Sequence, residues 1–229
     1  MALSFKHSVA LGITALFSLA ATDVMAEDWG PYIGIKGGYS LAHQFTVDLF
    51  HPSSDSFLDS DDLDYAPFIG IAVGVEMPIL PIRVELEATF RDNVDFEQTY
   101  DFGGTTTDQL PSIDSATYML IGYIDIPMPI PLIDPYISAG IGVSRNETAA
   151  KQYQAASDAV ENFSGKTLTE FSWTAGAGAT FELFEPFVLD AGYRFVYLGD
   201  WDAGVSPSGG NIVGEYGMHE AYAALRYMF

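Results

Sequence analysis

The last residues of the chain, 221–229, constrain the fold most, because apolar or aromatic side chains occupy every second position. Counted back from the end, these positions hold Phe229, Tyr227, Leu225, Ala223 and Ala221. Arg226 falls in the opposite phase. A period of two places the two sets on opposite faces of a β-strand. An aromatic face on a closing strand is typical of a membrane β-barrel, whose outer surface meets lipid. We therefore expect Leu225, Tyr227 and Phe229 to act as a barrel assembly signal.

Residues 1–26 have the features of a cleaved secretory signal peptide. Lys6 and His7 precede an apolar run over Val9–Ala21, and Val24-Met25-Ala26 fits a small-residue cleavage site. The run is too short for a good transmembrane helix, which disfavours the alternative of an uncleaved anchor. The sequence thus predicts export, with one domain over residues 27–229.

Composition narrows the class of protein further. The chain has no cysteine, so an exported protein of this kind cannot rely on disulfides or on a cysteine metal site. Its formal charge is −22, from 31 acidic and 9 basic residues, which argues against nucleic acid as a partner. No apolar stretch after Ala26 is long enough for a membrane-spanning helix.

Eight strand-like segments follow the signal, each long enough for the roughly 9–11 residues that cross hydrocarbon at a tilt. They cover Gly30–Gln44, Tyr65–Met77, Ile82–Phe96, Asp114–Ile126, Pro135–Arg145, Leu168–Leu183, Pro186–Leu198 and Gly217–Phe229. Short connections alternate with long polar ones, in which only Ala149–Val160 suggests a short helix. This alternation of short and long connections predicts an all-β fold: an eight-stranded antiparallel up-and-down transmembrane β-barrel with tight periplasmic turns and larger outer loops.

The composition of the two strand faces distinguishes a membrane barrel from a soluble one with an apolar interior. One face is apolar, with aromatic residues concentrated near the two ends of the strands, as expected of interfacial girdles. The other face interleaves charged residues with glycine, which suits a narrow lumen where long side chains need small neighbours. Unpaired buried charge is costly, so we expect a lumen ion-pair network. Its predicted members are Lys36, Glu76, Arg83, Glu85, Glu87, Arg91, Asp125, Glu182, Asp190, Arg194, Glu220 and Arg226.

Three motifs carry a family resemblance. They are the segment Pro135–Ser144, the segment Leu189–Phe195 with Leu198-Gly199-Asp200, and the terminal Tyr227-Met228-Phe229. Together the chain resembles the opacity-protein and outer-membrane β-barrel superfamily, which includes OmpA-like and OmpX-like barrels and small bacterial surface antigens. The resemblance covers nearly the whole mature chain and implies location in the outer membrane of a Gram-negative bacterium. It also implies contact with outer-membrane lipid and lipopolysaccharide, and folding by the barrel assembly machinery. Members often carry Asn four residues before the aspartate of the fourth strand, whereas this chain has Ile121 before Asp125.

Two clusters of residues raise the question of a cofactor or of catalysis. The first long loop contains an acidic cluster of Asp55, Asp59, Asp61, Asp62 and Asp64. Oxygen-rich clusters can hold Ca²⁺, but the spacing lacks the glycine and closing glutamate of an EF-hand, so a solvated acidic loop is the simpler interpretation. His43 and His219 fall on the first and last strands, in the outward phase, without a nucleophile motif such as G-x-S-x-G. We therefore expect no catalytic residue, metal or cofactor.

The favoured hypothesis is a non-enzymatic outer-membrane barrel: a surface antigen, adhesin or envelope-integrity protein whose acidic outer loops contact host or extracellular ligands. A small porin-like channel is one alternative, although eight strands leave an interior just filled by side chains. A lipid-modifying enzyme that uses His219, or a haem-binding surface protein, is the other.

Overall fold

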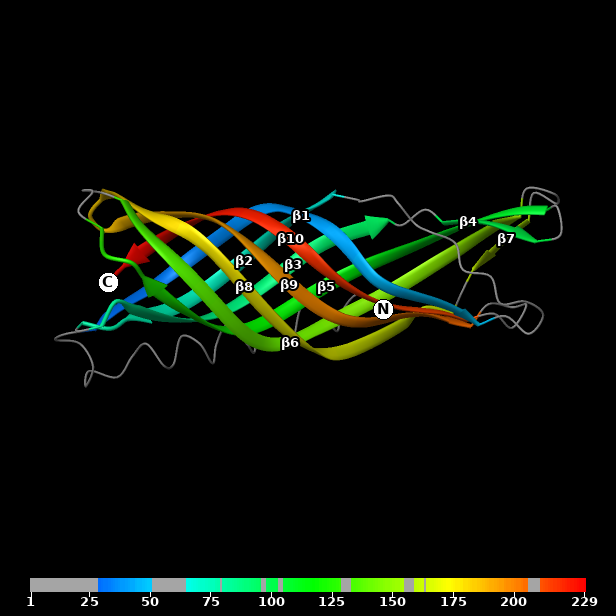
Figure 1. Ribbon diagram of the computed structural model, residues 1–229, viewed down its shortest axis with the longest axis horizontal. Helices are drawn as coiled ribbons and strands as arrows, with labels where there is room; N and C mark the ends of the chain where they lie inside the picture. The colour runs from blue at the N-terminus through cyan, green and yellow to red at the C-terminus, as the bar shows by residue number, and fades with distance from the viewer. Residues whose placement is uncertain are drawn as a thin grey trace.

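The computed structural model describes residues 29–50, 65–78, 80–95, 98–102, 105–128, 133–154, 159–162, 164–205 and 211–229. Ten strands form one sheet (Figure 1). They are β1 (Gly30–Phe50), β2 (Tyr65–Glu76), β3 (Ile82–Asp95), β4 (Gln98–Phe102), β5 (Thr105–Asp125), β6 (Ile133–Gln154), β7 (Ala159–Asn162), β8 (Lys166–Phe184), β9 (Phe187–Val205) and β10 (Asn211–Met228). Within these residues, no helix is long and apolar enough to cross a bilayer. The predicted signal peptide and the acidic cluster Asp55–Asp64 lie outside the described residues.

Eight of the strands close into the predicted antiparallel barrel. Each pairs with its neighbours along the chain, and β1 closes the cylinder against β10 with Ile33 opposite Tyr227. Closure leaves no free edge at membrane depth, which satisfies the backbone hydrogen bonds where water is absent. The remaining strands, β4 and β7, lie beyond the barrel, at the end opposite the C-terminus (Figure 1).

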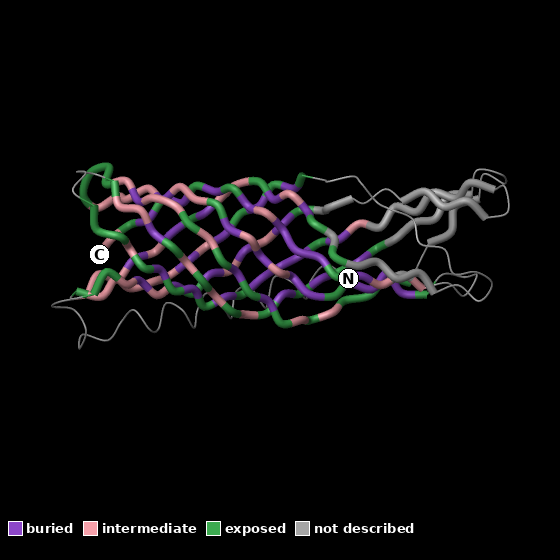
Figure 2. Tube along the Cα trace, viewed as in Figure 1, coloured by how far each residue is buried: buried purple, intermediate pink, exposed green. Residues whose placement is uncertain are grey.

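Side-chain exposure follows the period of two that the sequence predicts. In β2, exposed Tyr65, Pro67 and Ile69 alternate with buried Ala66, Phe68 and Gly70. Buried and exposed positions alternate along other strands as well (Figure 2). The exposed positions include large apolar residues, such as Ile35 at 59% and Ile69 at 64%. A surface of this kind fits contact with acyl chains rather than with water.

The strands run further outward than predicted, and the helix expected at Ala149–Val160 is wrong where it is described. Residues up to Gln154 belong to β6, and β7 begins at Ala159. In this stretch β6 pairs with β5, for example Ala149 with Ser112 and Lys151 with Leu110. Hydrogen bonds to a neighbouring strand thus override the local helix propensity of an alanine-rich segment.

Candidate functional site

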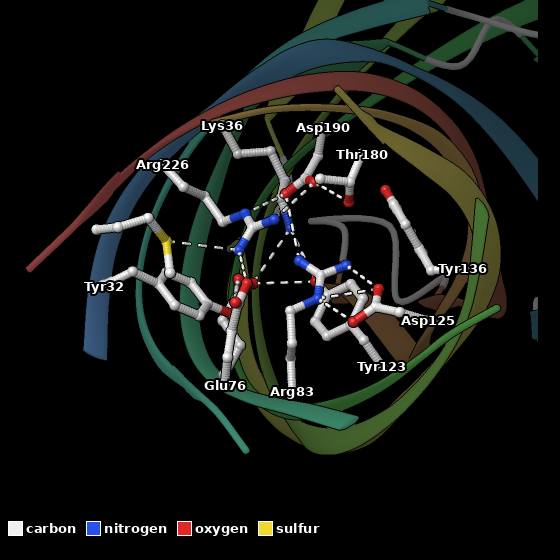
Figure 3. Close-up of polar contacts among 12 residues, drawn as sticks. Tyr32, Lys36, Glu76, Arg83, Tyr123, Asp125, Tyr136, Thr180, Asp190 and Arg226 are labelled. Atoms are coloured by element: carbon white, nitrogen blue, oxygen red, sulfur yellow. Dashed lines mark hydrogen bonds and ion pairs between the residues drawn. The ribbon is translucent and has the colours of Figure 1, made fainter. Parts of the chain in front are cut away.

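The lumen contains a network of paired charges, and its periplasmic half is built around Arg226 and Asp190 (Figure 3). Arg226 donates to both oxygens of Asp190, with Nε to Oδ2 at 2.7 Å and Nη2 to Oδ1 at 3.2 Å. Arg226 also donates to Glu76. Thr180 Oγ1 donates to Asp190 Oδ1 at 2.7 Å. These groups come from β2, β8, β9 and β10, so the contacts join strands on different sides of the barrel.

Arg83 forms the other part of this periplasmic cluster. Its Nε and Nη2 atoms donate to Asp125, with Nη2 3.0 Å from Oδ1. Its guanidinium carbon lies 4.6 Å from the ring centre of Tyr123 and 5.0 Å from that of Tyr136. The aromatic faces stabilise a cation that is almost fully buried.

A second cluster occupies the middle of the lumen, where Glu220 is fully buried between two arginines. Arg91 Nε and Arg194 Nε donate to its two carboxylate oxygens, each at 2.6 Å. Arg194 Nη1 also donates to Glu87 at 2.7 Å, and Glu87 in turn pairs with Lys36. The cluster thus links β1, β3, β9 and β10 through charge-assisted hydrogen bonds, which are stronger than neutral ones.

Glu85 completes the middle cluster and joins it to buried tyrosines. Lys36 Nζ lies 3.4 Å from Glu85 Oε1. Tyr123 and Tyr32 donate their hydroxyls to the two oxygens of Glu85, at 3.0 and 3.1 Å. The two clusters fill this part of the lumen with oppositely charged groups. Within the described residues, three buried guanidinium nitrogens have no hydrogen-bond partner: Arg83 Nη1, Arg91 Nη2 and Arg194 Nη2.

Eleven of the twelve predicted lumen residues lie in these clusters, and Glu182 does not. Glu182 keeps the inward phase of β8, opposite Val188, but it is exposed near the turn that joins β8 to β9. Among the described residues it has no ion pair. Glu182 lies at the periplasmic mouth of the barrel, where its side chain is exposed. Its predicted place in the lumen network is corrected accordingly.

The sequence reasoning missed the inward tyrosines Tyr32, Tyr136 and Tyr222. The Tyr136 and Tyr222 hydroxyls lie 2.9 Å apart at the centre of the barrel. A Cβ placed on Gly178 would fall 2.4 Å from the Tyr136 hydroxyl oxygen, so this glycine makes room for a tyrosine. The interleaved glycines that predicted a crowded lumen therefore face aromatic as well as charged side chains.

An apolar layer, also missed, fills the outer half of the lumen. Its fully buried members are Ile113, Val196, Leu198, Trp201, Tyr216 and Met218. In β9 the inward phase changes from charged Asp190 and Arg194 to apolar Val196 and Leu198. Continuing the alternation past Arg194 would have revealed this change in the sequence.

A bulge at Gly199 brings Trp201 into the apolar layer. The ladder between β9 and β10 shifts there, and Gly199 has a φ of 78°. Because of the shift, Trp201 is buried three residues after buried Leu198. Strict alternation from Leu198 would have turned Trp201 outward. Buried Asn146 holds the bulge, because its Nδ2 donates to the carbonyls of Leu198 and Asp200 at 2.9 and 3.0 Å.

The predicted histidine pair lies on the outer surface of the barrel. The His43 and His219 ring centres are 5.6 Å apart, and His219 Nδ1 contacts the Tyr193 hydroxyl. Phe45 and Phe195 pack on these rings at 5.0 and 5.1 Å. The histidines therefore form part of an aromatic cluster. Within the described residues there is no group of three or more side chains of the types that commonly hold a metal.

Aromatic side chains also cluster at the periplasmic end, where the predicted assembly signal lies. Tyr227 packs against Phe187 and Phe229, with ring centres 5.5 and 5.2 Å apart. Leu225, Tyr227 and Phe229 are all exposed, Phe229 at 75%. Aromatic clusters at both ends of an apolar band match the two interfaces of a bilayer.

A closed antiparallel barrel with an apolar exterior and a sealed, charged interior defines an integral outer-membrane β-barrel protein. The family model of the outer membrane protein beta-barrel domain matches residues 9–229, so this chain belongs to that family. The protein is located in the outer membrane of a Gram-negative bacterium.

The chain is also similar to individual outer-membrane proteins. Outer membrane protein PagN of Salmonella typhimurium is 30% identical over 162 residues, which cover 68% of this chain and 64% of PagN. The match thus spans slightly less than two thirds of that relative's length. A major outer membrane protein from Thermus thermophilus superposes with a TM-score of 0.51 at 14% identity, over 88% of this chain and 99% of that one. Neisserial surface protein A gives a TM-score of 0.48 at 18% identity, over 87% and 97% of the two chains.

Proposed function

We propose that this protein is a non-enzymatic surface antigen or adhesin, whose rigid barrel displays a β-sheet outside the membrane for binding extracellular partners. The observation that carries the proposal is the length of β5 and β6. They stay paired from Asp125 opposite Tyr136 to Thr107 opposite Gln154, whereas about 10 residues suffice to cross hydrocarbon. The outer parts of both strands therefore extend beyond the membrane.

Two short strands widen this projection into a four-stranded sheet. β4 pairs with β5 from Gln98 opposite Gln109 to Phe102 opposite Thr105, and β7 pairs with β6 from Lys151 opposite Asn162. The sheet is visible at the end of the barrel away from the C-terminus (Figure 1). A surface held by such a scaffold binds without a large ordering cost, which suits recognition.

The filled lumen supports a binding role over the porin-like alternative. The Glu220 cluster and the apolar layer of Val196, Leu198 and Trp201 lie in series along the barrel axis. Ions that moved through the lumen would have to displace buried ion pairs and then enter a dry apolar segment. We infer that the barrel is a platform rather than a channel.

The charge of the chain favours basic extracellular partners. Its formal charge of −22 resides largely outside the balanced lumen network. Complementary charge speeds encounter and excludes wrong partners. The predicted contacts with lipopolysaccharide and with the barrel assembly machinery are part of the same proposal.

The test removes the projecting sheet and leaves the barrel. Asn-Gly turns replace residues 95–112, between paired Val94 and Ile113, and residues 149–165, between paired Thr148 and Lys166. A non-adherent laboratory strain that expresses the full chain should attach to cultured epithelial cells, and the shortened barrel should not.

Both proteins are first compared by heat-modifiable gel mobility, which reports the folded barrel. Retained mobility with lost attachment is the expected result. Attachment that persists after both hairpins are removed would refute the assignment of binding to the sheet.

A further inference from the structure

The two histidines on the outer surface lie on β1 and β10, the strands that close the barrel. His219 of β10 is opposite Leu41 of β1, and His43 of β1 is opposite Gly217 of β10. The histidines are therefore diagonal neighbours on paired strands, and their ring centres are 5.6 Å apart. Side chains in this relation are within reach of each other.

Aromatic side chains support both imidazole rings. Phe45 packs against His43 with ring centres 5.0 Å apart, and Phe195 packs against His219 at 5.1 Å. Gly217 makes room for the second contact, because a Cβ there would fall 2.5 Å from Phe195 Cζ. The ladder between β1 and β10 shifts at Phe45, and a bulge of this kind re-aims a side chain. Rings that are already packed lose little freedom when they bind a ligand.

Tyr193 orients the ring of His219. Its hydroxyl contacts Nδ1, which leaves Nε2 as the nitrogen for a ligand. When Nδ1 carries the proton and donates it to the hydroxyl oxygen, the lone pair of Nε2 is available. Histidines that bind metal ions commonly have their second ring nitrogen held in this way, which fixes the tautomer and the ring orientation.

The spacing of the two rings suits a shared metal ion. Imidazole nitrogens bind Zn²⁺ at about 2.0–2.1 Å, so two imidazoles on one tetrahedral ion have ring centres roughly 5 Å apart. The observed distance of 5.6 Å is close to this value, and a small rotation of the rings would bring one nitrogen of each to the ion. Within the described residues there is no group of three metal-binding side chains, so the other coordination positions would be open to water.

The charge of this part of the surface favours a cation. Five of the nine basic residues belong to the lumen network, and Lys6 lies in the predicted signal peptide. The remaining three are on β6 and β8: Arg145, Lys151 and Lys166. β1 and β10 therefore have no lysine or arginine outside the lumen. The formal charge of −22 also concentrates cations near the protein surface.

From this arrangement we propose that His43 and His219 form an open binding site for a divalent transition-metal ion of the copper or zinc type. Imidazole is a preferred ligand of these ions, whereas Ca²⁺ and Mg²⁺ prefer oxygen. Cu²⁺ binds more tightly than Zn²⁺ at sites of a given kind, so it should be the stronger ligand here. An anionic ligand would meet no lysine or arginine on these two strands.

The test titrates the mature, untagged protein in detergent micelles with Cu²⁺, in the presence of excess Mg²⁺ to occupy exposed carboxylates. Isothermal titration calorimetry gives the stoichiometry and the affinity, and electron paramagnetic resonance identifies nitrogen ligands. We expect one tightly bound Cu²⁺ per chain, with a spectrum that shows coupling to imidazole nitrogen. Zn²⁺ should displace this ion only at a higher concentration.

Three variants test the residues of the site, in protein that keeps heat-modifiable mobility. His43→Gln and His219→Gln each remove one ligand and should lower the affinity for Cu²⁺ by more than about tenfold. Tyr193→Phe keeps the ring but removes the hydroxyl that orients His219, and it should weaken binding by about tenfold. The matched control is His51→Gln, which removes the other histidine that follows the predicted signal peptide and should change nothing. His51 lies outside the described residues.

The proposal would be overturned if Cu²⁺ bound to the unmodified protein showed no nitrogen coupling, or if Mg²⁺ abolished binding. Affinity that survives both His43→Gln and His219→Gln would overturn it as well. An equal loss in His51→Gln would contradict the assignment of the site to the strand pair, and unchanged affinity in Tyr193→Phe would contradict the orientation of His219.

Discussion

The lumen network makes a quantitative prediction about Glu220. Its carboxylate is fully buried and accepts hydrogen bonds from Arg91 and Arg194 at 2.6 Å each and from Ser40 at 3.1 Å. In Glu220→Gln the amide keeps one acceptor oxygen, but its NH₂ group faces a guanidinium. Arg91 loses the counter-charge of its ion pair with Glu220, and Arg194 keeps only Glu87. Breaking a buried pair in this way costs about 3–5 kcal/mol, because uncompensated charge remains in the interior.

The assay is reversible urea unfolding of the barrel in lipid vesicles, followed by tryptophan fluorescence. Glu182→Gln is the matched control, since Glu182 is exposed and has no ion pair among the described residues, and its free energy of unfolding should change by less than about 0.5 kcal/mol. The loss in Glu220→Gln should also persist at high salt, because buried pairs are screened little. A loss below about 1 kcal/mol, or one that disappears in salt, would refute the claim that the network stabilises the barrel.

Three further predictions concern the bulge, the lumen and the chain end. Gly199→Ala should lower the free energy of unfolding by about 1–3 kcal/mol in the same urea assay, because φ is 78° and the new Cβ would lie 2.6 Å from Glu170 Cβ. The control Gly37→Ala, where the nearest atom to the new Cβ is 3.7 Å away, should have little effect. Similar losses for both variants would contradict a special role for the bulge. Planar-bilayer recordings of the purified barrel should show no steady conductance steps, since ion pairs and the Trp201 layer fill the lumen, and regular open steps would revive the channel hypothesis. Phe229→Ala should reduce the amount of barrel assembled in cells but leave refolding into vesicles nearly unchanged, because Phe229 is 75% exposed. An equal defect in both measurements would assign Phe229 to packing instead of recognition by the assembly machinery.

The barrel and its two faces were predictable because a period of two is a local property of a strand. Ile35 and Lys36 are neighbours in sequence, yet one is 59% exposed and the other 5%. The eight barrel strands and their order also followed from the alternating connections. The outer extensions of β5 and β6 did not, since their residues lack a clear alternation of apolar and polar side chains and become strand by pairing with each other and with β4 and β7.

The members of the lumen network were largely predictable, but their partners were not. Glu220 and Arg194 are cross-strand neighbours, so a hairpin model would have paired them. The contacts of Glu220 with Arg91 and of Arg194 with Glu87 cross the lumen between strands far apart in sequence. Glu182 has the same inward phase as the network residues and still lies outside the network. The alternation indicates which face of the strand a side chain takes, but not how far along the barrel axis it lies.

The sequence by itself determined which side chains face lipid and which face inward, because alternation needs only the local backbone. The tertiary structure decided which charges pair, that Trp201 joins the apolar layer, and where the ladder between β2 and β3 ends. These features depend on the stagger between strands and on the phase change at Gly199, which barrel closure sets for all strands together.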